Sequence, residues 1–178
     1  VVPAMTILYF LGSIAIIIMN ITNIPGVFSD IFKYAFTPYA GVGGVAGTTV
    51  WLSMRYGVAR GIFSNEAGLG AASIVHAQAK SSPVQQGMWG IWEVFIDTLV
   101  VCTLTAVVIL STGVLGTLNE AGVALRGAEL TSAAFTKGLP GPGGYIVLIA
   151  LVFFAYTTML TWNFYGEKSW EYLFGNKV

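Results

Sequence analysis

Long uncharged stretches divide the 178-residue chain into candidate membrane spans. A helix needs about 20 apolar residues to cross roughly 30 Å of hydrocarbon. The uncharged stretches predict spans over about 3–20 and 145–165, and a third span is predicted over about 86–112, which carries only Glu93 and Asp97. After the span at 3–20, residues 27–36 place apolar side chains on one helix face and Asp30 and Lys33 on the other. That distribution predicts a short helix lying at the membrane interface.

The stretch from residue 41 to residue 80 does not fit one straight helix. Its 40 residues would reach about 60 Å, roughly twice the thickness of the hydrocarbon core. It is also rich in glycine and carries Arg55, Arg60 and Glu66. We therefore expect an interrupted span over about 46–79, discontinuous near 62–70, since membranes tolerate such backbone inside protein or beside a cavity. The alternative is a loop at the membrane surface.

The segment from about 113 to 144 is rich in glycine and small residues, and we expect a loop with a short helix near 118–125. The chain begins without a methionine and ends just after a charged segment. We therefore expect residues 1–178 to be an interior fragment of one transmembrane domain. The distribution of basic residues weakly favours a cytoplasmic turn at Lys80.

Composition supports an all-α integral membrane protein. Hydrophobic residues make up 56% of the chain and charged residues only 9%, whereas soluble domains carry about 25% charged residues. The net charge of zero provides no electrostatic attraction for nucleic acid. A single cysteine, Cys102, excludes a disulfide scaffold.

Candidate chemistry points to binding rather than to catalysis. The lone His76 has no neighbouring histidine or cysteine, so a metal role is disfavoured, and no nucleophile cluster indicates an enzyme. A helix that breaks inside a bundle leaves free N–H groups that attract anions and free carbonyls that hold cations. An amino-acid carboxylate and a sodium ion suit such a break. In the last span, Thr157 and Thr158 either offer oxygen ligands to a cation or bond back to their own helix.

Four motifs together resemble the alanine or glycine:cation symporter family. They are the run GVARGIFSNEAGLG at 57–70, AQAK at 77–80, PVQQG at 83–87 and VFIDT at 94–98. The resemblance covers nearly the whole chain. It implies part of a leucine-transporter-type inverted-repeat fold, holding the last helix of the first repeat and the first three helices of the second. The break near 62–70 would then belong to the opening helix of the second repeat.

The resemblance also implies a function and a set of site residues. It places Phe63, Ser64, Asn65 and Gly68 at the substrate pocket, and Thr157 and Thr158 at a sodium site shared with an upstream broken helix. The expected activity is symport of alanine or glycine with sodium, in some members with protons, across the cytoplasmic membrane of prokaryotes. Its partners would be the amino acid, the lipid bilayer and the remainder of the same transporter. The open alternative is a pore-lining or structural subunit of a membrane channel.

Overall fold

The computed structural model describes residues 2–36, 55, 58–59 and 65–175, and these parts of the chain are helical with connecting turns. The elements are the α-helices α1 (Val2–Met19), α2 (Ile24–Phe36), α4 (Ala71–His76), α5 (Pro83–Phe95), α6 (Cys102–Ser111), α7 (Gly127–Gly138) and α8 (Gly143–Phe174), the 3-10 helix η1 (Ile21–Asn23) and the π-helix η2 (Ile96–Val101). Within the described ranges there is no β-strand, only an isolated bridge between Leu118 and Ala124. The all-α prediction is therefore confirmed.

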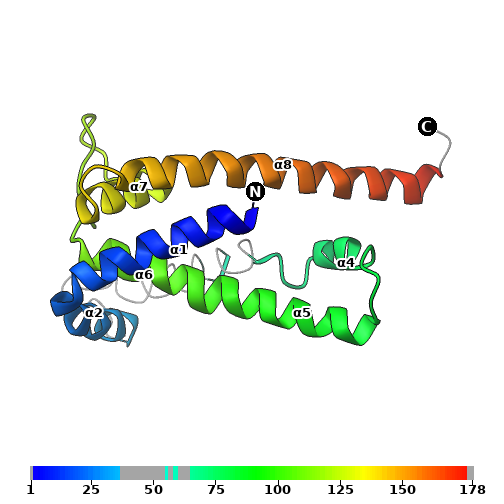
Figure 1. The fold of residues 1–178 in the computed structure, drawn as a ribbon, viewed down its shortest axis with the longest axis horizontal. Coiled ribbons are helices and arrows are strands. Elements are labelled where there is room, and N and C mark those ends of the chain that lie inside the picture. Colours follow the sequence, from blue (N-terminus) through cyan, green and yellow to red (C-terminus); the bar gives the residue numbers. More distant parts are fainter. Residues whose placement is uncertain (1, 37–54, 56–57, 60–64, 176–178) are drawn as a thin grey trace, which may run out of the picture.

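Two helical segments are long and apolar enough to cross a membrane. One is the continuous helix formed by α5, η2 and α6 over Pro83–Ser111, and the other is α8. They run alongside each other in Figure 1, with α1 between them. α1 and the helical segment Ile21–Lys33 meet at an angle of 73° and qualify as a third span only if counted together. α8 is longer than the predicted span of 145–165, because the helix continues through its charged tail to Phe174.

The predicted short helix near 118–125 is wrong. Asn119 accepts hydrogen bonds from the backbone N–H groups of Ala121 and Val123 through its side chain, and Gly122 adopts a left-handed φ of 72°. Asparagine side chains that bond to nearby backbone in this way compete with helix formation. The helix of this segment is α7, which begins further along the chain, at Gly127.

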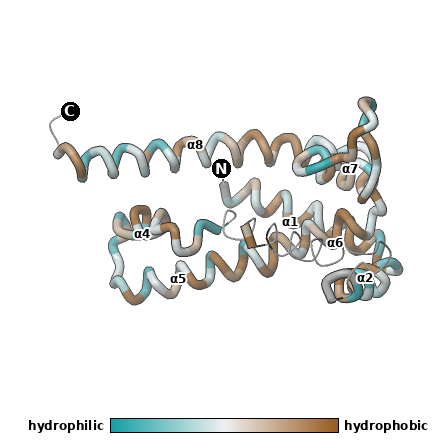
Figure 2. The backbone as a smooth tube through the Cα atoms, turned by 180° about the vertical axis from the view of Figure 1, so that it is seen from behind, coloured by the Kyte–Doolittle hydropathy of each residue, from teal (hydrophilic) through white to brown (hydrophobic). Residues whose placement is uncertain are grey.

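The core lies where α1, α6, α7 and α8 meet. Ile16, Val108 and Phe135 are fully buried there, together with Val147. The ring of Tyr9 stacks on that of Phe135 with 5.3 Å between centroids. Beyond this cluster, large apolar side chains on α5 and α8 are exposed. Figure 2 shows hydrophobic residues along both helices. Such surfaces are suited to lipid and to neighbouring helices.

Candidate functional site

The chain breaks its helical conformation directly after Asn65. Glu66, Gly68 and Gly70 all have left-handed φ angles, of 53°, 82° and 83°, and α4 begins only at Ala71. Glycine adopts this conformation without a steric penalty, whereas a non-glycine residue such as Glu66 pays of order 1–3 kcal/mol. The non-helical stretch expected here is thus observed over residues 66–70. Most of the expected span before the break, together with Arg60, Phe63 and Ser64, lies outside the described residues.

Asn65 holds this break against the helix formed by α5, η2 and α6. Its Oδ1 accepts a hydrogen bond from the backbone N–H of Ala67 at 2.9 Å, and its Nδ2 donates to Oγ1 of Thr98 at 2.6 Å. The amide therefore joins two segments that are 33 residues apart. An asparagine amide has two N–H donors and two acceptor lone pairs, and among the described residues one donor and one acceptor of Asn65 have no partner. Its expected role as a substrate ligand stays a prediction.

Thr98 reaches Asn65 from the π-helix η2, which interrupts the regular hydrogen bonding of the helix Pro83–Ser111. π-Helical turns are rare and occur frequently at functional sites. The same turn carries Asp97, one helical turn after Glu93. The sequence pattern predicted an uninterrupted span here and did not reveal the π-helix.

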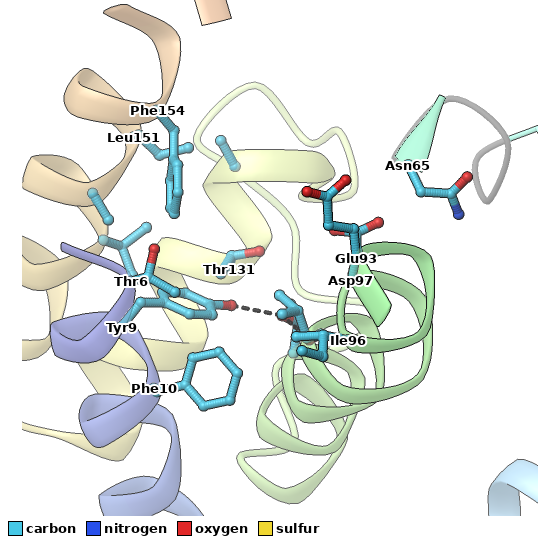
Figure 3. A pocket seen from close by; sticks show the side chains of 15 residues that line it. Thr6, Tyr9, Phe10, Asn65, Glu93, Ile96, Asp97, Thr131, Leu151 and Phe154 are labelled. Atoms are coloured by element: carbon cyan, nitrogen blue, oxygen red, sulfur yellow. Dashed lines mark hydrogen bonds between the residues drawn. The ribbon is translucent and has the colours of Figure 1, made fainter. Parts of the chain in front are cut away.

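A cavity of about 720 Å³ lies between the break and the core. α1, α7 and α8 contribute Phe10, Thr131 and Phe154 to a largely apolar wall. In Figure 3, the carboxylates of Glu93 and Asp97 project from the α5–η2 helix near Asn65. On another wall, Tyr9 and Thr105 share a hydrogen bond of 2.6 Å, drawn as a dashed line in Figure 3. An apolar pocket with a few converging polar groups is typical of a small-molecule site.

A second cavity, of about 430 Å³, is lined by one residue of the predicted substrate site, Asn65, and by both threonines of the predicted sodium site. Asn65 and Glu66 line it from the break, and Thr157 and Thr158 line it from α8. These residues are about 90 positions apart in the sequence, and α4 packs against α8 to close the space between them. The residue types suit a cation because carboxylate, amide and hydroxyl groups all supply hard oxygen ligands.

The two threonines differ in what their hydroxyls do. Oγ1 of Thr157 donates to a backbone carbonyl of its own helix, with Phe153 O at 2.9 Å and Phe154 O at 3.1 Å. This is the back-bonding alternative that the sequence left open. For Thr158, the described part of the chain contains no hydrogen-bond partner of the hydroxyl. A sodium-ligand role stays a prediction for both residues.

Gly68 does not line the 430 Å³ cavity that Thr157 and Thr158 line. It lines a recess between the break and α5, opposite Gly87 and Gly90. Glu66 lines the 430 Å³ cavity and Asp97 lines the 720 Å³ cavity. Among the described residues, no three His, Cys, Asp or Glu side chains are grouped so as to hold a metal ion.

Sequence reasoning missed the polar contacts of α4. His76 bonds to Gln86 and Glu93 on α5, although its sequence neighbours suggested no partner. The available signal was spacing, since Gln86 and Glu93 are seven residues apart and therefore lie on the same helix face. Thr98 had no such signal, because its contact with Asn65 depends on the π-helix.

These features together describe a helical chain with two segments long and apolar enough to cross a membrane and a broken segment beside two cavities. Residues 1–178 match the family model described as the sodium:alanine symporter family. The chain belongs to this family, which the sequence motifs had already indicated.

Individual relatives agree with the family. The chain is 45% identical to the sodium/alanine symporter AgcS of Methanococcus maripaludis, over 99% of this chain and 38% of the relative. It is 43% identical to an uncharacterized transporter, YflA, of Bacillus subtilis, over 98% of this chain and 37% of the relative. It is 39% identical to a sodium/proton-dependent alanine carrier protein of Bacillus sp. PS3, over 97% of this chain and 40% of the relative. The chain thus spans about two fifths of the length of these relatives.

Proposed function

We propose that this chain forms part of a secondary active transporter that moves alanine or glycine together with sodium. Family membership and the relatives named as sodium/alanine and sodium/proton-dependent alanine carriers support this function. The observation that carries it is the 430 Å³ cavity, because it joins the helix break to the hydroxyls of Thr157 and Thr158. A shared cavity gives the amino acid and the cation a direct route to influence each other's affinity.

The proposed architecture is one part of a leucine-transporter-type inverted repeat. The break at 66–70 supports this architecture, since discontinuous helices near the bilayer midplane form the binding sites of such carriers. The relatives are longer than this chain, so we propose that the remaining length of the carrier supplies the other half of each site. The carrier would be a multi-pass protein of a prokaryotic cytoplasmic membrane.

The proposed substrate site comprises Phe63, Ser64, Asn65 and Gly68, and the proposed sodium site includes Thr157 and Thr158. After its contacts with Thr98 and Ala67, one donor and one acceptor position of Asn65 have no partner in the part of the chain that the structure describes. Phe63 would limit the size of the substrate side chain, so Phe63→Ala should admit larger amino acids than alanine.

Uptake by proteoliposomes tests the function. The full-length carrier that contains this chain should accumulate radiolabelled alanine when an inward sodium gradient is imposed, and the uptake should saturate with alanine concentration. Replacing sodium by potassium at equal ionic strength is the control and should abolish accumulation. Alanine flux that does not saturate, or that is independent of sodium, would contradict the proposal and favour a channel.

A further inference from the structure

His76 is fixed between two acceptor groups on α5. Its Nδ1 lies 2.6 Å from Oε1 of Gln86, and its Nε2 lies 3.1 Å from Oε2 of Glu93. Gln86 donates from its Nε2 to the hydroxyl of Ser81, which leaves its oxygen facing the imidazole ring. The side chain of His76 is 19% exposed and that of Glu93 is 60% exposed. These contacts attach the end of α4 to α5.

The contacts of His76 with Gln86 and Glu93 determine how many protons the His76–Glu93 pair must hold. The amide oxygen of Gln86 accepts only, so Nδ1 of His76 must carry a proton. A neutral imidazole has a single N–H, so its Nε2 would present a lone pair to Glu93. The contact with Glu93 is therefore a hydrogen bond only if one more proton is present, either on Nε2 or on the carboxyl group. In both arrangements the His76–Glu93 pair holds one exchangeable proton.

We propose that His76 and Glu93 form a proton-binding site that joins α4 to α5 when it is occupied. Loss of the proton would place the Nε2 lone pair against the Glu93 carboxylate, and the contact between the two helices would be lost. Because α4 follows the break at 66–70 directly, occupancy of this site would set the position of the segment after the break. Histidine is suited to this role because its charge ordinarily changes between pH 5 and 8.

The charged and titratable groups around the pair favour a bound proton. Glu66 from the break and Tyr165 from α8 line the same 430 Å³ cavity as His76 and Glu93. Asp97 lies one turn beyond Glu93 on η2. Among the described residues that line this cavity, His76 is the only basic one. A proton on His76 is thus the only positive charge that the described lining residues can place beside the carboxylates of Glu66 and Glu93.

The site would also affect sodium binding, a consequence that rests on the proposed function. Thr157 and Thr158 line the same cavity, so a proton on the pair and a sodium ion near the threonines would repel each other. Proton and sodium binding should then oppose each other, and by linkage each should weaken the other to the same extent.

The first test measures the proton directly. The full-length carrier, labelled with isotopic histidine and held in lipid nanodiscs, is titrated by NMR, and the His76 signal is assigned by its absence in His76→Gln. We expect Glu93→Gln to move the titration midpoint of His76 to lower pH, because the hydrogen bond with the carboxylate favours the protonated imidazole. Glu120→Gln, a charge change in an exposed loop, is the matched control and should not move it. Equal midpoints in wild type and Glu93→Gln would overturn the proposal.

The second test measures the link to sodium by alanine uptake between pH 5.5 and 8.5. In wild type, the sodium concentration for half-maximal uptake should rise as the pH falls, by up to about tenfold per pH unit where the two cations exclude each other. His76→Gln should flatten this dependence, and if that variant does not assemble, Glu93→Gln should shift it to lower pH. The same pH dependence in wild type and variant would overturn the proposal. Uptake independent of sodium at every pH would instead refute the proposed function, while the NMR titration would still decide the proton site.

Discussion

The two ends of the molecule are held together by different forces. At the packed end, where α1, α6, α7 and α8 meet, Ile16, Val108 and Phe135 are fully buried. At the break end, formed by residues 65–76 with α5 and the second half of α8, neither α4 nor α5 has a buried residue. Segments there are joined by polar contacts instead, such as Asn65 with Thr98. α8 passes through both ends, as Figure 1 shows.

This difference separates a scaffold from an adjustable site. Truncating a buried aromatic side chain costs about 3–5 kcal/mol, whereas a typical hydrogen bond contributes a net 0.5–1.5 kcal/mol or so. Among the described residues, the contacts of the break end are therefore mainly hydrogen bonds, whereas those of the packed end are buried apolar contacts. Regions with few buried apolar contacts are those that open most readily, so the break end is the part of the described chain in which we expect substitutions to affect binding more than stability.

The largest effect on stability is expected from Phe135→Ala. Phe135 is fully buried and stacks on Tyr9, so the variant should lose about 3–5 kcal/mol of stability. Thermal unfolding of the purified carrier in detergent measures this loss. Phe153→Ala, which truncates an exposed ring on α8, is the matched control and should change the unfolding temperature little. Similar losses in both variants would contradict the distinction between the two ends.

The next effect concerns the contact that fixes the break. Thr98→Val keeps the side-chain shape but leaves the Asn65 amide without its partner, at a cost of about 1–3 kcal/mol. We expect the alanine concentration for half-maximal uptake to rise about fivefold or more, and Thr98→Ser to restore it. Thr103→Val, on the exposed side of α6, is the control. Unchanged alanine affinity in Thr98→Val would show that the break needs no support from η2.

A smaller effect is expected from glycine conformation alone. Gly70 has a φ of 83°, and a Cβ atom there would meet no atom within 4 Å. Gly70→Ala should therefore cost about 1–2 kcal/mol through the left-handed backbone. Gly87→Ala is the matched control, because a Cβ atom there would also meet no atom within 4 Å, but Gly87 lies inside the helix α5. This variant should be neutral or slightly more stable than the wild type. The unfolding temperatures of the two variants test this, and equal values would argue against a fixed break at residue 70.

The break and the π-helix show what the sequence could and could not predict. The break was predictable because glycines such as Gly68 and Gly70 crowd a stretch too long for one span, a constraint set by helix geometry. The π-helix was not, because the residues of Ile96–Val101 are ordinary for an apolar helix. The helix α7 was also missed, since its glycines and small residues resemble those of the loop before it.

The smallest effect separates the two threonines on α8. The hydroxyl of Thr157 is engaged with carbonyls of its own helix, whereas that of Thr158 has no such partner among the described residues. We therefore expect Thr158→Val to raise the sodium concentration for half-maximal alanine uptake about fivefold, which corresponds to about 1 kcal/mol. Thr157→Val should raise it by less than about twofold, since a back-bonded hydroxyl contributes little to the ion. Sodium titrations of uptake at a fixed alanine concentration measure both. If Thr157→Val has the larger effect, its hydroxyl turns toward the ion when sodium binds; if neither variant changes the sodium dependence, the ion site lies away from α8.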